Sequence, residues 1–71
     1  MKASEKLAKA VCEALNSSSE VKAIIEAAGE NAEQIKSAMY NMLWVQALMN
    51  DENLRSEVEY ETFEGVMKRI S

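Results

Sequence analysis

The sequence predicts an all-α fold, a small bundle of about four helices in which the third helix is long and central. The chain has no proline and only two glycines among its 71 residues, so few positions interrupt a helix. Good helix formers (Ala, Glu, Lys, Leu and Met) dominate its composition. Apolar residues recur three and four positions apart along most of the chain. Because independent domains run to about 100–200 residues, we expect residues 1–71 to form a single helical domain.

Local end signals place the first two helices. Ser4 is the expected N-cap of a first helix that ends near Leu15. A short second helix is expected from Ser19 to Ala28, because the hydroxyls of the preceding serines can bond its free N–H groups. Gly29 then suits the position after the helix end, where a left-handed backbone costs glycine nothing.

The third predicted helix, roughly 31–49, is the most informative one. From Met39 to Met49 only Asn41 and Gln46 are polar, so its C-terminal half is apolar around nearly the whole circumference. A helix that is apolar all round must be surrounded by other elements. We expect the other helices to pack around its Ile35–Met39 half, which leaves the C-terminal half to a second copy of the chain.

The last predicted segment, about 54–70, has two possible interpretations in its first half. Within residues 57–63, three glutamates at 57, 59 and 61 alternate with Val58, Tyr60 and Thr62, which is typical of a strand. A helical stripe from Leu54 to Ile70 explains more residues, and a lone strand would have no pairing partner. The spacing therefore favours a helix, weakened at Gly65.

The residue types argue against catalysis. The chain has no histidine and one cysteine, which excludes a histidine-based triad and an intramolecular disulfide. Cys12 lies beside the apolar stripe of the first helix, which is typical of a buried small hydrophobe. The glutamates near the C-terminus are interpreted as a solvated face, and mimicry of nucleic acid remains open. We expect no enzyme activity, no cofactor and no metal.

These observations predict a small non-catalytic protein-interaction module, a regulator, adaptor or inhibitor that acts as a helical homo-oligomer. The partners would be the chain itself and a further, unidentified protein. Nucleic acid is not expected as a partner, because the net charge is −4. No apolar run is long enough for a membrane span, and we expect a cytoplasmic protein. The predicted interface consists of Tyr40, Trp44, Val45, Leu48, Met49 and Phe63.

One pattern supports an alternative function. Residues 20–38 contain Ile24-Ile25-x-x-Ala28-Gly29 followed by Ile35 and Ala38, which resembles the helix-turn-helix motif of DNA-binding regulators. Ile25 and Glu30 depart from the usual small and apolar residues at their positions. The resemblance implies a transcriptional regulator whose possible DNA-binding residues are Asn31, Gln34, Lys36 and Ser37. An αα-hairpin with a glycine at its turn gives the same pattern.

Overall fold

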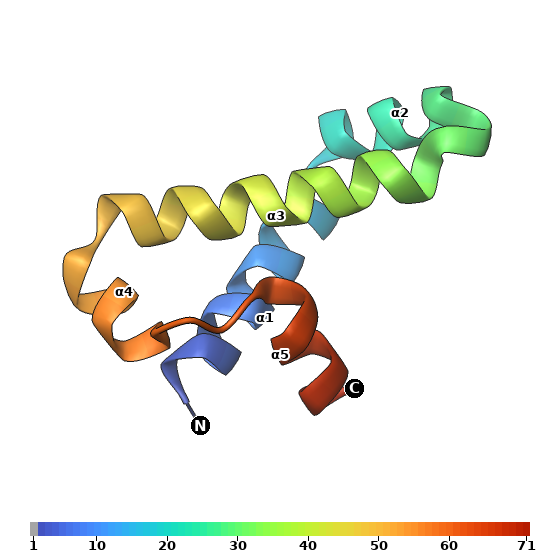
Figure 1. The fold of residues 1–71 in the computed structure, drawn as a ribbon. Coiled ribbons are helices and arrows are strands. Elements are labelled where there is room, and N and C mark those ends of the chain that lie inside the picture. The colour runs from blue at the N-terminus through green and yellow to red at the C-terminus, as the bar shows by residue number, and fades with distance from the viewer. Residues whose placement is uncertain (1) are drawn as a thin grey trace.

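The computed structural model describes residues 2–71, and this part of the chain is helical without strands (Figure 1). Its elements are α1 (Ala3–Asn16), α2 (Ser19–Ala28), the short 3-10 turn η1 (Gly29–Asn31), α3 (Ala32–Asn50), α4 (Glu52–Val58) and α5 (Phe63–Ile70). The long α3 crosses the molecule, and each of the other α-helices makes contacts with it (Figure 1). The predicted all-α class with a long central third helix is confirmed.

The boundaries of α2 follow the predicted local signals. Ser18 precedes the helix, and its hydroxyl accepts a hydrogen bond from the Val21 amide at 3.2 Å. Gly29 follows it with φ 58° and ψ −116°, a conformation that glycine adopts without steric cost. From there α3 runs back along α2 in the opposite direction, so the two form a helical hairpin.

The N-cap prediction for Ser4 is wrong. α1 begins two residues earlier than predicted, and its N-cap position is occupied by Lys2, which makes no side-chain capping bond. Ser4 lies inside the helix and is only 1% exposed. Its hydroxyl accepts a hydrogen bond from Arg69 of α5 at 3.2 Å. The Ser4 hydroxyl, which was expected to cap the helix, therefore makes a tertiary contact with the last helix instead.

The core lies under the middle of α3, not under its N-terminal half as predicted. Trp44 is its buried centre on this helix, at 4% exposure. Buried residues of four elements form the core cluster, which contains Ala8, Val11, Trp44, Val58, Phe63 and Val66. Along the Ile35–Met39 half only α2 and the end of α1 lie close by (Figure 1). The indole ring of Trp44 is larger than the side chains of Ile35 and Met39, so its enclosure buries more apolar surface.

The C-terminal segment forms two helices where one was predicted. α4 ends at Val58, and residues 59–62 turn the chain before α5 begins at Phe63. Glu59 has φ 59° and ψ −119°, and the amide of Glu61 donates to the carbonyl of Val58 at 3.3 Å. These values are those of a type II′ turn, whose first central position favours glycine. The Thr62 hydroxyl then accepts from the Gly65 amide at 3.1 Å and caps α5.

Arg69 ties this turn to α1. Its guanidinium hydrogen-bonds the Glu61 carboxylate and forms a second ion pair with Glu5 at 3.2 Å. It also donates to the buried Ser4 hydroxyl. The hydrogen bond from Arg69 lowers the pKa of Glu61 to about 2 from its usual 4.5. One arginine thus connects the start of the chain, its last helix and the turn between α4 and α5.

Candidate functional site

One side of α3 carries a line of apolar side chains that the rest of the chain leaves uncovered. Met42 is 70% exposed, Val45 52% and Met49 71%. With the exposed Ala38, they are spaced by four, three and four residues, so they fall on one side of the helix. We call Ala38, Met42, Val45 and Met49 the α3 face. It is the largest group of exposed apolar side chains on one element of residues 2–71.

The α3 face is also free of charge. Between Ser37 and Asn50 the sequence contains no acidic or basic residue. The exposed residues that border the face are the uncharged Asn41 and Gln46. A chain that carries −4 overall therefore presents one neutral, apolar strip about 18 Å long, given the rise of about 1.5 Å per residue.

The predicted interface residues separate into three groups. Val45 and Met49 are exposed on the α3 face, and Tyr40 and Leu48 are half-buried against the core. Trp44 and Phe63 belong to the core itself, at 4% and 9% exposure, so they cannot provide exposed surface for a partner.

Aromatic packing explains why those two residues are enclosed. The rings of Trp44 and Phe63 meet edge to face with centroids 5.8 Å apart. The Tyr40 ring stacks on Phe63 at 4.9 Å with an interplanar angle of 11°. Such contacts add to the area that the rings bury. A single chain therefore covers the aromatic side of α3, and the expectation that this side needs a second copy is wrong for Trp44.

The prediction did not include Met42 and Ala38 among the interface residues. The signal that would have found them is their spacing. Ala38, Met42, Val45 and Met49 recur with the alternating interval of a helix-pairing seam. In a segment that is apolar all round, this seam does not stand out until the structure shows which side is covered.

The residues of the DNA-binding alternative lie around the α2–α3 hairpin. Asn31, Gln34 and Ser37 are exposed, whereas Lys36 is half-buried with its ammonium 6.0 Å from the centre of the Tyr40 ring. The exposed Glu33 lies among them. The antiparallel course of the two helices is that of an αα-hairpin, the other arrangement compatible with the sequence pattern.

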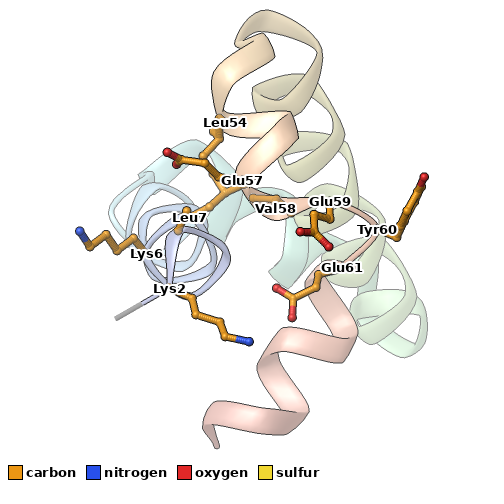
Figure 2. A pocket seen from close by; sticks show the side chains of 10 residues that line it. Lys2, Lys6, Leu7, Leu54, Glu57, Val58, Glu59, Tyr60 and Glu61 are labelled. Atoms are coloured by element: carbon orange, nitrogen blue, oxygen red, sulfur yellow. The ribbon is translucent and has the colours of Figure 1, made fainter.

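A second surface feature is an open groove of about 1040 Å³ between the start of α1 and the end of α4 (Figure 2). Leu7, Leu54 and Val58 supply its apolar lining. Lys2 and Lys6 stand on its α1 side, and Glu57, Glu59 and Glu61 stand on the other side. The ring of Tyr60 points away from the groove and is 99% exposed. The groove therefore has charges of both signs at its rim and no enclosed interior.

Two reactive side chains show no catalytic activation. Glu61 has a lowered pKa, so it stays ionised near neutral pH, whereas a general acid needs a raised pKa. Cys12 is half-buried, and its sulfur lies 4.0 Å from that of Met67. Burial raises the pKa of the Cys12 thiol, which disfavours the nucleophilic thiolate.

Searches of known families and proteins add no function to this geometry. No protein family, curated protein or solved structure matches the chain. Among residues 2–71 no helix has the length and apolar character that a membrane span requires. The same residues contain no group of three His, Cys, Asp or Glu side chains placed to hold a metal ion.

Proposed function

We propose that this chain is a small non-catalytic protein-interaction module, a regulator, adaptor or inhibitor, that pairs with a second copy of itself through the α3 face. The observation that carries the proposal is the exposure of Met42, Val45 and Met49 along one line of the longest helix. Contiguous exposed apolar surface of this kind is typical of interaction sites, and methionine suits such surfaces because it adapts its shape.

Charge favours a second copy as the occupant. Two chains of net charge −4 repel each other over most of their surfaces. The α3 face is the part of α3 where two copies can meet without bringing like charges together, since residues 37–50 are uncharged. A positively charged partner would gain no electrostatic attraction at the neutral α3 face. The α3 face of a second copy matches it in apolar character and in length.

The side-chain sizes favour an antiparallel, two-fold pairing of α3 with its copy. In that arrangement Ala38 lies opposite Met49 of the other copy, and Met42 lies opposite Val45. Each large side chain then faces a smaller one, which allows the two helices to interdigitate. A two-fold arrangement is also the commonest symmetry of homodimers.

The expected affinity is modest. Full burial of a Met or Val side chain contributes about 1.5–3 kcal/mol. Met42, Val45 and Met49 are already partly covered in the single chain, so we take roughly 1–2 kcal/mol for each of them. Two copies supply only six such side chains, which is a small apolar interface for a protein dimer. We therefore expect a reversible dimer with a dissociation constant that is micromolar or weaker.

Light scattering on a size-exclusion column, from micromolar to millimolar protein, tests this proposal. The average mass should rise with concentration from one chain towards two. Val45→Lys places a charge at the centre of the α3 face and should keep the protein at the mass of one chain. Ile24→Lys is the matched control, because Ile24 on α2 is 48% exposed against 52% for Val45.

Circular dichroism should show that both variants keep their helices. A wild-type protein that stays at the mass of one chain at millimolar concentration would refute self-association. Equal dimerisation of wild type and Val45→Lys would show that the pairing uses another surface.

A further inference from the structure

The two most exposed methionines that the structure describes both lie on the α3 face. Met42 is 70% exposed and Met49 71%, and they lie on either side of Val45. Met39 and Met67 are half-buried, the latter packed against the core and Cys12. An oxidant in solution therefore reaches the sulfur atoms of Met42 and Met49 before the other two.

We propose that Met42 and Met49 are a methionine-oxidation site through which peroxides switch off the self-association of this chain. This inference rests on the proposed function. The sulfur lone pair attacks one oxygen of the peroxide, an S–O bond forms and the O–O bond breaks. With hydrogen peroxide, the proton of the sulfur-bound oxygen passes to the departing hydroxide, so the sulfur loses two electrons to become a sulfoxide and the peroxide is reduced to water.

The consequence for pairing follows from the polarity of the product. A sulfoxide is a strong hydrogen-bond acceptor, whereas the thioether it replaces is apolar. In the pair, Met42 and Met49 would face Val45 and Ala38 of the other copy, and neither of these side chains carries a donor. Against these apolar side chains the oxygen would lose hydrogen bonds that it makes to water in the separate chain, so oxidation favours the separate chain.

The reaction should proceed from the separate chain, because pairing covers both sulfur atoms. Oxidation at Met42 and Met49 should therefore slow as the protein concentration rises through the range of dimerisation. Sulfoxides are reduced by dedicated reductases, so the change is reversible in principle. Cys12 is a poor competitor for peroxide, since it is half-buried and its thiol is disfavoured from ionising.

The test treats dimeric protein with increasing hydrogen peroxide and follows two quantities. Peptide mass spectrometry reports the addition of oxygen at each methionine and at Cys12, and light scattering reports the mass. We expect Met42 and Met49 to gain oxygen before the other methionines. The mass measured by light scattering should fall to that of one chain as these two sulfoxides form. The variant Met42→Leu/Met49→Leu keeps the apolar face without its sulfur atoms, and it should remain dimeric at the same peroxide dose.

Three results would overturn the inference. The first is a wild-type dimer that persists with both sulfoxides formed, and the second is a double-leucine variant that dissociates equally, which would place the sensitive group elsewhere. Both leave the proposed function intact, because the untreated protein is dimeric. The third is an untreated wild-type protein that is monomeric, which refutes the proposed function itself. Circular dichroism of the treated protein should show that the helices persist.

Discussion

Replacement of Glu59 by glycine should stabilise the protein. Glu59 is the one non-glycine residue with positive φ that the structure describes, at φ 59° and ψ −119°. Gly29 ends α2 with nearly the same angles, φ 58° and ψ −116°. The chain therefore contains the same turn conformation twice, once with the residue type that suits it and once with a residue whose Cβ opposes it.

The magnitude follows from two opposing terms. A non-glycine residue in a sparsely populated backbone region costs about 1–3 kcal/mol. Glycine lowers the stability of the folded protein by about 0.5–1 kcal/mol, because it has more conformational freedom to lose when the unfolded chain folds. The net stabilisation of Glu59→Gly is therefore about 0.5–2 kcal/mol. For a domain of this size, each 1 kcal/mol raises Tm by about 4–8 °C.

Thermal and urea denaturation should be measured in the Val45→Lys background, so that self-association does not contribute to stability. Glu59→Ala is the essential control, since it removes the charge beside Glu57 and Glu61 but keeps the Cβ, and it should bring little of the gain. Gly29→Ala is the reciprocal change. No atom lies within 4 Å of the added Cβ, so only the backbone opposes it, and a loss of about 0.5–2 kcal/mol, the reverse of the gain at Glu59, is expected.

If Glu59→Gly were no more stable than Glu59→Ala, the positive φ of Glu59 would not store the strain inferred here. If Gly29→Ala were as stable as the parent, the cost assigned to this conformation would be wrong at both turns.

Three further predictions concern the ends of the chain and the dimer. Arg69→Leu should lower the urea midpoint, because it removes the guanidinium that joins Glu61 to α1, and unchanged stability would show that this contact is inert. The pKa of Glu61 is lowered to about 2 from 4.5, so its stabilisation is complete above pH 4.5 and lost as pH falls towards 2. The stability gap between wild type and Glu61→Gln should therefore close over that range, and a constant gap would contradict the lowered pKa. For the dimer, in a Cys12→Ala background, chains carrying Ala38→Cys should cross-link under mild oxidation to chains carrying Met49→Cys. Self-linked Met49→Cys dimers would instead indicate a parallel pair.

Most helix boundaries could be predicted because they depend on a few neighbouring residues. A serine accepts the first free amide of α2, a glycine ends that helix, and Asp51 ends α3 and caps α4 through the amides of Asn53 and Leu54. These are contacts within four residues, so the local sequence contains all the information they need. Ser4 differs, since it is buried and its hydroxyl accepts a hydrogen bond from Arg69, 65 residues away in the sequence.

The break between α4 and α5 could not be predicted for a related reason. A helical stripe continues through residues 54–70 in the sequence, and no proline or glycine stands at the turn. The chain turns at Glu59 against local preference. Two sets of contacts compensate for the unfavourable backbone conformation of Glu59. Val58 and Phe63 are buried in the same core, at 1% and 9% exposure, and Arg69 forms an ion pair with Glu61.

The amino-acid pattern alone predicts that this protein is all-helical, that its third helix is the longest, and that this helix carries more apolar surface than a helix on the surface of a small bundle normally has. It did not determine which side of the helix is covered. Trp44 and Met42 are both apolar residues two positions apart, and periodicity treats them alike. The packing of α1, α4 and α5 against α3 encloses Trp44 and leaves Met42 at 70% exposure, because burial depends on contacts between segments far apart in the chain.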